Sequence, residues 1–204
     1  MPPSDPAAAA LARNDRYLLE FVERFNLCPF ARRCRETGKL ARRVLLGADA
    51  EALLPRALEA LGQLEALPKG DVEVALLICP EFAGDHRAFD VLREEVRRAS
   101  RDFYCVTFHP DLPEDLGDAH RAVGFVRRSP DPTLQLVRAD LLERVRGENT
   151  SGSVFVDSSK LSVAELLALQ TPQALAERIA EDNLATLRRE GPERLRVLLR
   201  GLRR

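Results

Sequence analysis

The 204-residue sequence lacks the features that mark several specialised classes of protein. Its formal net charge is -1, so it has no basic excess to contact phosphates, and we expect no nucleic-acid partner. No apolar run reaches the roughly 18 residues that a membrane-spanning helix requires, so no membrane span is expected. The first ten residues have neither a basic segment nor a long apolar core. No secretory signal is therefore predicted, and we expect a cytoplasmic protein.

The motifs of the common enzyme classes are also absent. There is no G-x-G-x-x-G, P-loop, H-E-x-x-H or G-x-S-x-G, which disfavours the usual nucleotide-binding loops, zincin hydrolysis and serine hydrolysis. Four scattered cysteines without a C-x-x-C pair are too few for a disulfide scaffold. Three histidines leave little material for a histidine-rich metal site. What remains is 45% hydrophobic residues, enough to build the core of one globular domain.

Hydrophobic periodicity predicts alternating helices and strands. Arginines within 40–46 indicate an edge strand, whereas the apolar run 72–78 is typical of a central one. We predict an α/β fold, a single domain in which helices flank a mainly parallel sheet of three to five strands. Helices are expected at 6–26, 31–37, 49–66, 85–99, 131–147, 162–169, 172–189 and 193–204, and strands at 40–46, 72–78, 103–108, 123–126 and 154–156.

We expect the domain to cover residues 15–191. An N-terminal extension over 1–14 precedes it, and an arginine-rich C-terminal helix or tail over 192–204 follows it. This last segment has leucines on one stripe and five arginines elsewhere. A helix that packs its leucine stripe is the simplest interpretation. A protein-interaction module that uses the arginines is a weaker alternative.

The segment Asn26–Ala31 (NLCPFA) is the most unusual in the chain. Pro29 favours extended geometry at Cys28, and a helix that begins directly afterwards would place the thiol beside its N-terminus. That position lowers the pKa of a thiol and favours the thiolate. Cys28 is therefore a candidate catalytic nucleophile or thiolate ligand, and Asn26 a candidate ligand-binding residue. The alternative is a buried cysteine in a tight turn.

His109 follows the strand predicted at 103–108. Ligand sites in open parallel sheets gather at the carboxyl ends of strands, which makes His109 a candidate catalytic base, metal ligand or axial ligand. Asp111 is a candidate to orient it. The alternative is a hydrogen-bonded residue that only ends the strand. His86 and His120 lie in polar stretches and are interpreted as surface residues.

Two further positions are candidates for ligand binding. Arg127, Arg128 and Ser129 precede a predicted helix, and two guanidiniums, a hydroxyl and free helix N–H groups together form an anion site. Capping by Asp131 beside solvated arginines is the alternative. Asn183 places an amide on the apolar stripe of the helix at 172–189, so it must find a partner, either a backbone carbonyl or a ligand.

Four motifs occur in a fixed order and together resemble one family. They resemble an uncharacterised bacterial family, domain of unknown function 1415, over about residues 17–191. Members of this family usually have histidine at the position of Gln135 and asparagine at the position of Arg127. If the family's histidine holds a metal or cofactor, the resemblance implies that this chain is a divergent or inactive member. The motifs are Asn26–Ala31 (NLCPFA), Phe108–Asp111 (FHPD), Arg128–Arg138 (RSPDPTLQLVR) and Asn183–Arg189 (NLATLRR).

A more distant resemblance is to the YqcI/YcgG group, which includes haem-dependent N-oxygenases. It rests on a Pro/Cys/Phe cluster before a helix and on a later Arg/Ser segment. This resemblance makes haem a candidate cofactor. The residues by themselves do not specify a cofactor.

Two functional hypotheses follow. The leading one is a small-molecule enzyme, redox or haem-linked, in which Cys28 and His109 line one pocket and Arg128 and Ser129 hold an anionic group. Cys28 or His109 would also be the ligand of any metal. The alternative is a non-catalytic anion- or ligand-binding domain without a reactive centre. The separation of Cys28 and His109 distinguishes the two, and the oligomeric state is left open.

Overall fold

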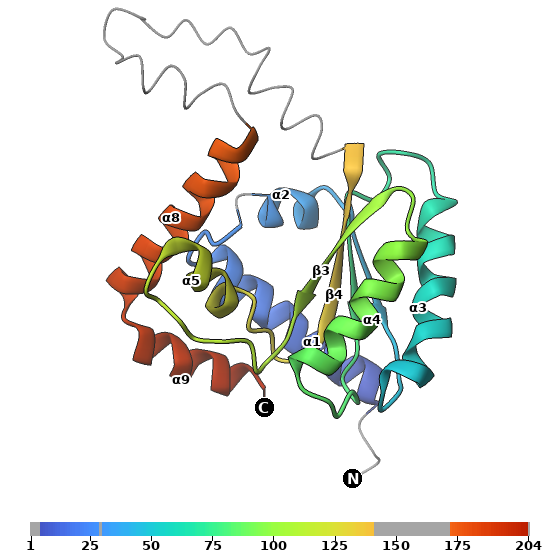
Figure 1. Cartoon of the computed structure of the whole chain (residues 1–204), viewed down its shortest axis with the longest axis horizontal. Coiled ribbons are helices and arrows are strands. Elements are labelled where there is room, and N and C mark those ends of the chain that lie inside the picture. The colour runs from blue at the N-terminus through green and yellow to red at the C-terminus, as the bar shows by residue number, and fades with distance from the viewer. Residues whose placement is uncertain (1–4, 29, 141–171, 204) are drawn as a thin grey trace, which may run out of the picture.

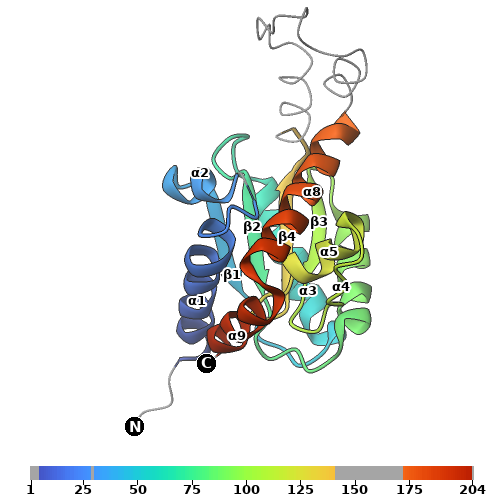
Figure 2. The ribbon, with the colours of Figure 1, turned by 90° about the vertical axis from the view of Figure 1, so that its left-hand side faces the viewer.

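A computed structural model describes residues 5–28, 30–140 and 172–203. In these residues a four-stranded sheet is covered by helices on both faces (Figures 1 and 2). The helices are α1 (Pro6–Tyr17), the π-helical η1 (Leu18–Glu23), α2 (Ala31–Glu36), α3 (Ala50–Glu65), α4 (His86–Ala99), α5 (Ala119–Val126), α8 (Pro172–Glu190) and α9 (Pro192–Leu202). The strands are β1 (Leu40–Val44), β2 (Val74–Ile78), β3 (Phe103–Phe108) and β4 (Thr133–Arg138).

The strand order is β1-β2-β4-β3, which confirms the α/β class but not a mainly parallel sheet. β1 and β2 are parallel, whereas β4 runs antiparallel to both β2 and β3. The prediction was wrong because the segment after Asp131 was interpreted as a helix. Leu134 and Val137 lie three residues apart and fit a helical stripe, and periodicity alone does not separate a short apolar run in a strand from one in a helix.

The strand predicted at 123–126 is also wrong, because these residues end helix α5. Asp118 caps this helix, since its carboxylate accepts a hydrogen bond of 2.9 Å from the backbone N–H of Arg121. The predicted edge and central positions of β1 and β2 are confirmed. The elements predicted at 154–156 and 162–169, and the second half of the helix predicted at 131–147, lie outside the described residues.

Two hydrophobic clusters form, one on each face of the sheet. Helices α3 and α4 cover the first face, where Leu77 of β2 is fully buried. Helices α1, α5, α8 and α9 cover the second face together with η1, and Leu76 and Ile78 of β2 point there. The predicted leucine stripe of the C-terminal helix is buried in this second cluster, through Leu195, Leu199 and Leu202.

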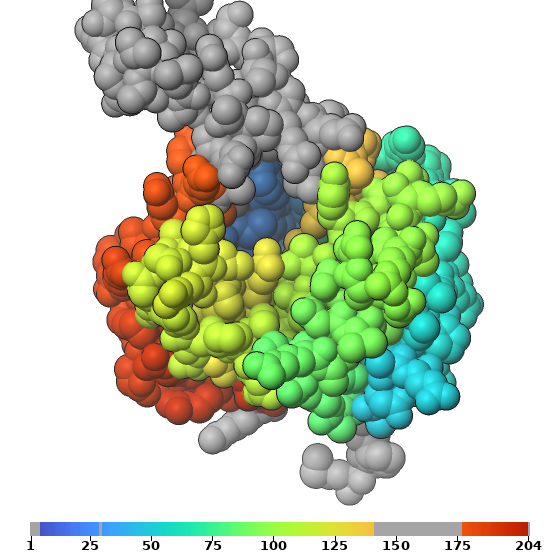
Figure 3. Space-filling model, viewed as in Figure 1, coloured from blue at the N-terminus to red at the C-terminus, as the bar shows by residue number. Residues whose placement is uncertain are grey.

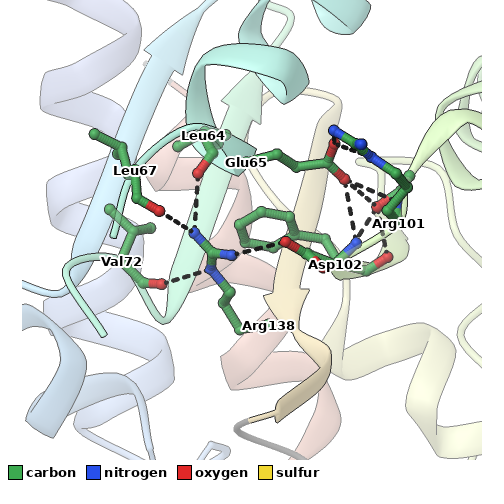
Figure 4. A network of polar contacts seen from close by, with 9 residues as sticks. Leu64, Glu65, Leu67, Val72, Arg101, Asp102 and Arg138 are labelled. Carbon is green, nitrogen blue, oxygen red and sulfur yellow. Dashed lines mark hydrogen bonds and ion pairs between the residues drawn. The ribbon is translucent and has the colours of Figure 1, made fainter. Parts of the chain in front are cut away.

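Arg138, at the end of β4, carries a fully buried charge that the protein itself satisfies (Figure 4). Its guanidinium donates to the carbonyls of Leu64, Leu67 and Val72 at 3.0, 3.2 and 3.3 Å. It also lies 3.3 Å from the carboxylate of Asp102. Cations are favourable at the carbonyl end of a helix, so Arg138 holds the C-terminal end of α3 against the sheet. Among the described residues, no helix has both the length and the apolar character needed to cross a bilayer.

Candidate functional site

A cavity of about 500 Å³ lies between the second face of the sheet and the helices that cover it. Figure 3 shows the hollow between α8 and α5 on one side and the sheet on the other, with the N-terminal segment at its floor. Its walls are mostly apolar. The row of paired residues Leu76, Gln135 and Val106, from β2, β4 and β3, forms part of the sheet wall.

Arg127 follows the last residue of α5 and lines this cavity. Its guanidinium makes no hydrogen bond or ion pair with any residue of the described part of the chain. Burial lowers the pKa of Arg127, and only the nearby phenol of Tyr17 opposes this effect. A partly desolvated charge without a counter-ion is costly, so this side chain is suited to an anion that enters the cavity.

Tyr17 lies near both Arg127 and Cys28. Its hydroxyl donates a hydrogen bond of 3.1 Å to the carbonyl of Val126, the residue directly before Arg127. Burial raises the pKa of Tyr17 far above its usual range, with a smaller effect in the same direction from Cys28. The phenol therefore stays neutral, and it fixes α1 against the end of α5.

Asn14 precedes Tyr17 by one helical turn and also lines the cavity. The residue is 4% exposed, and its Oδ1 has no hydrogen-bond partner. Within the described ranges it is the one fully buried side-chain oxygen or nitrogen in this condition. Buried polar groups in proteins are nearly always paired, so this oxygen is an exception within the described ranges.

Two more amides face the same space. Asn183 of α8 and Gln135 of β4 both line the cavity, and neither side chain hydrogen-bonds to another described residue. The side-chain amide of Asn183 was predicted to bond either to a backbone carbonyl or to a ligand. No backbone carbonyl of the described chain is its partner. Whether it serves a ligand stays a prediction.

Cys28 lines the cavity as well, but its pKa is shifted opposite to the predicted direction. Burial raises the pKa of the thiol, and hydrogen bonding from the backbone of Phe30 and Ala31 only partly opposes this. The sequence showed the N–H groups that lower the pKa but not the depth of burial. At neutral pH the sulfur is therefore a thiol. Its role as a nucleophile stays a prediction.

His109 does not line this cavity. It is buried, and its Nδ1 accepts a hydrogen bond of 3.1 Å from the backbone N–H of Asp111. Nε2 therefore carries the proton and donates to the carbonyl of Gly84, at 3.2 Å. Burial lowers the pKa of His109, which favours the neutral ring. The structure thus does not bring Cys28 and His109 into one pocket, and Asp111 contacts the ring through its backbone.

The predicted anion site at Arg128 and Ser129 is divided. Arg128 points away from the cavity, forming an ion pair with Glu114 and donating to the carbonyl of Leu112 at 3.1 Å. Ser129 does line the cavity, and its hydroxyl donates to the carbonyl of Asp131 at 2.5 Å. Asn26 is not among the lining residues and adopts φ 51°, which suits asparagine in a turn.

Sequence reasoning missed the most informative lining residues. Arg127 was predicted only as part of an anion site shared with Arg128 and Ser129, and Asn14 and Tyr17 were not considered. A signal was present, because Asn14, Tyr17 and Leu18 share one face of the N-terminal helix and the first of them is polar. His120 was interpreted as a surface residue; it is exposed and lines the rim of the cavity.

No metal centre is found in the described ranges, which contain no group of three or more His, Cys, Asp or Glu side chains that could hold an ion. This statement does not extend to residues 141–171. Within the described ranges, neither Cys28 nor His109, the predicted metal ligands, therefore belongs to such a group.

Comparison with known protein families gives a match to this chain. The family model described as "Protein of unknown function (DUF1415)" matches residues 9–155. This range includes Asn14, Tyr17 and Arg127 but ends before α8 and the motif at 183–189. No curated protein and no solved structure matches the chain, and nothing found supports the resemblance to haem-dependent oxygenases. Since the match covers well over half of its length, the chain belongs to the DUF1415 family of proteins of unknown function.

Proposed function

We propose that this protein binds a small organic anion, a carboxylate with an apolar body, in the cavity between the sheet and α1, α5 and α8. The observation that carries the proposal is Arg127, a residue that lines the cavity and whose guanidinium has no counter-ion in the described chain. A bound carboxylate would accept two parallel hydrogen bonds from it and compensate for its desolvation.

The size and lining of the cavity support a ligand with an apolar body. Its volume of about 500 Å³ lies within the roughly 300–1,000 Å³ of small-molecule sites. Strand residues such as Val74 and Phe108 and helix residues such as Leu18 and Ile179 form the walls. Apolar walls with a few polar groups are typical of such sites, where the walls supply affinity and the polar groups set orientation.

A carboxylate fits better than a phosphate. A single guanidinium matches the charge and the planar shape of one carboxylate. A phosphate dianion needs more cations or donors, and Glu177 on α8 adds a negative charge to the lining. The site therefore favours a monoanion.

The enzyme hypothesis has less support. It required Cys28 and His109 to share a pocket, and it required the thiolate form of Cys28. His109 is held by backbone groups outside the cavity, and burial raises the pKa of Cys28. Ligand binding without a reactive centre is consistent with both observations.

Isothermal titration calorimetry with hexanoate, octanoate and decanoate, and with octanamide as the uncharged analogue, tests the proposal. We expect the wild-type protein to bind octanoate more tightly than octanamide. Arg127→Gln should weaken octanoate binding by about tenfold or more and abolish the preference, because hydrogen bonds to charged groups contribute roughly 1.5–3 kcal/mol. The matched control is Arg56→Gln, which changes an exposed arginine of α3 on the other face of the sheet.

Two outcomes would contradict the proposal. One is the absence of binding by all three carboxylates. The other is an equal loss of octanoate affinity in Arg127→Gln and Arg56→Gln, which would indicate a general charge effect.

A further inference from the structure

We propose that an extended peptide with an acidic residue binds in a groove along the outer edge of β3 and adds a strand to the sheet. The groove has a volume of about 330 Å³. It is distinct from the cavity of the proposed function, although Val106, Val123 and Arg127 line both. The inference goes beyond that function, because it depends on the backbone of Cys105 and Thr107, which do not line the cavity.

The lining residues place this groove at the edge of the strand. Cys105, Val106 and Thr107 all line it, although the side chains of neighbouring strand residues point to opposite faces of a sheet. A hollow that touches three consecutive residues therefore runs along the edge. Its walls come from α4 on one face of the sheet and α5 on the other, and Figure 1 shows β3 between these two helices. The helical lining residues are Asp90 and Arg93 of α4 and Val123 and Gly124 of α5.

Strand β3 pairs with β4 and is the last strand in the order β1-β2-β4-β3. In an antiparallel pair, alternate residues direct their N–H and C=O groups towards the partner strand, and the residues between them direct theirs outwards. The N–H of Ala139, directly after β4, donates to the carbonyl of Asp102, directly before β3, at 2.9 Å. By this alternation and the register of the two strands, the residues of β3 that bond to β4 are Tyr104, Val106 and Phe108.

The backbone groups of Cys105 and Thr107 therefore point outwards from the sheet. Their two N–H and two C=O groups have no partner in the part of the chain that the structure describes. The two residues are only 9% and 8% exposed, and shielded backbone groups in proteins are nearly always paired. Two donors and two acceptors that repeat at every second residue match the backbone of an extended peptide. A segment of three residues could exchange all four hydrogen bonds.

The outward groups on either side of this stretch are already bonded. At one end, the hydroxyl of Ser100 donates to the carbonyl of Phe103 at 2.9 Å and accepts from its N–H at 3.0 Å. At the other end, the N–H of His109 donates to the carbonyl of Arg127 at 3.1 Å. The protein thus closes its own edge before and after the groove and leaves it open within the groove.

Both walls of the groove are fastened to β3. The hydroxyl of Thr107 donates to the carboxylate of Asp90 on α4 at 2.6 Å, and Arg93 donates to the same oxygen at 3.0 Å. The bond between His109 and Arg127 holds the end of α5 at the opposite wall. These contacts keep α4 and α5 apart, so the helices do not close over the open backbone groups.

A single peptide fits this groove better than a second copy of the chain. The edge of a second copy lies between its own α4 and α5. In a pair of such edges the helices would meet before the two strands came within the roughly 4.8 Å that separates paired strands. An extended peptide has no flanking helices.

The charges of the groove favour an acidic peptide. Asp90 and Arg93 form an ion pair with each other, so their charges are compensated within the groove. Arg127 also lines the groove, and its guanidinium has no counter-ion in the ranges that the structure describes. An aspartate or glutamate of the peptide would supply one.

Fluorescence polarisation with a labelled hexapeptide, Thr-Val-Glu-Val-Thr-Val, tests the inference on the wild-type protein. Two further peptides carry N-methyl groups, one on the first, third and fifth residues and one on the second, fourth and sixth. In a bound strand only one of these sets faces β3. We therefore expect one methylated peptide to bind at least about tenfold more weakly than the parent and the other to bind about as well. Replacing the glutamate by glutamine and by lysine should weaken binding in that order.

Amide hydrogen exchange measured by NMR locates the bound peptide. In the free protein the amides of Cys105 and Thr107 should exchange faster than those of Tyr104 and Val106, which bond to β4. Saturating peptide should slow the first two amides by about tenfold or more and leave the second two unchanged.

Thr107→Pro removes one of the outward N–H groups, and proline is accepted in edge strands where the N–H faces away from the sheet. This variant should bind the hexapeptide at least about tenfold more weakly than wild type. The matched control is Thr107→Val, which loses the hydroxyl that bonds to Asp90 but keeps the N–H, and it should still bind the peptide. If Thr107→Pro does not fold, the methylated peptides and hydrogen exchange on wild type still decide.

Three outcomes would overturn the inference. The first is equal binding of the two methylated peptides, and the second is binding of the lysine peptide as tight as that of the parent. The third is slower exchange of the amides of Cys105 and Thr107 at higher protein concentration without peptide, which would identify a second copy of the chain as the occupant. Failure of octanoate to bind would remove the proposed function alone, because the peptide test depends on the backbone of β3.

Discussion

Arg13 donates two hydrogen bonds to the carboxylate of Asp131, at 3.0 and 2.8 Å, across a sequence separation of 118 residues. The Asp131 side chain is 11% exposed and that of Arg13 is 22% exposed, so the pair is largely shielded from water. This contact joins the first helix to the start of the last strand described in the sheet. It thereby fixes α1 relative to β4, and residues of both elements line the cavity.

We expect Asp131→Asn to lower the free energy of unfolding by about 1–3 kcal/mol, because it removes a bidentate, charge-assisted contact. Urea unfolding of this variant, of Arg13→Gln and of the double variant forms a cycle that isolates the pair. The double variant should be little less stable than the worse single one. Strictly additive effects would show that the two side chains do not interact in solution.

Cys28 should react slowly with iodoacetamide at neutral pH, because burial raises the pKa of its thiol. The rate should still rise by about tenfold per pH unit near pH 8, as the thiolate fraction does below the pKa. Bound octanoate should slow the reaction further by covering the sulfur. Mass spectrometry of the labelled peptide measures both effects.

Cys28→Ser is the control for this experiment. The other cysteines, Cys34, Cys79 and Cys105, are buried, and burial raises their pKa values to about 11, 12 and 12. The variant should therefore show almost no labelling. If the labelling rate of wild-type Cys28 no longer rises with pH at neutral pH, the sulfur is already a thiolate. The enzyme hypothesis would then be better supported than ligand binding without a reactive centre.

His109 should make the protein less stable in mild acid. Burial lowers its pKa, opposed by the negative charges of Asp111 and Asp85, so the unfolded chain takes up the proton first. This contribution to stability is complete above about pH 6.5 and is lost as the pH falls through the lower, folded pKa. Urea unfolding at pH 7 and pH 5 should show a larger loss for wild type than for His109→Gln.

The same variant should be less stable than wild type at pH 7 by about 1–3 kcal/mol, since the ring bonds to two backbone groups. His120→Gln, which changes an exposed histidine, should keep the wild-type difference between the two pH values. If octanoate binding is lost in folded His109→Gln but not in His120→Gln, His109 contributes to the site after all.

Gly124 in α5 should not tolerate a side chain. A Cβ at this position would lie 2.6 Å from the backbone carbonyl oxygen of Pro113, which is too close for any heavy atom. Gly124→Ala should therefore destabilise the protein by about 1–3 kcal/mol, as overpacking does. Gly62→Ala in α3 meets nothing within 4 Å and should instead stabilise by about 0.5–1 kcal/mol. Thermal unfolding of both variants compares them, and equal effects would contradict the close approach.

Elements with a long or unambiguous pattern could be predicted from the sequence. Helix α4 buries Phe89, Leu92 and Val96, the three residues that its periodicity assigned to the core. β2 is central because its apolar run needs cover on both faces. The segments at 123–126 and 133–138 were too short for their pattern to separate strand from helix, and packing against the neighbouring strands decided between them.

The candidate site was predicted only in part. Cys28, Ser129 and Asn183 line the cavity, whereas His109, Arg128 and Asn26 do not. The expectation that His109 and Cys28 meet rested on a parallel sheet, in which strand ends share one edge. Because β4 is antiparallel to both β2 and β3, these two strands run in the same direction and still end at one edge of the sheet. Cys28 precedes β1 rather than following a strand, so the shared edge does not bring it to His109.

The sequence by itself determined the class of fold, most of the helices that cover the sheet and the family to which the chain belongs. Composition and periodicity act locally, so they are readable without coordinates. Only the tertiary structure decided which charges and amides lack a partner. Arg127 and Arg128 are adjacent in sequence, yet Arg128 pairs with Glu114 whereas Arg127 lines an apolar cavity. The difference arises because ion pairing depends on residues that folding brings together from distant parts of the chain.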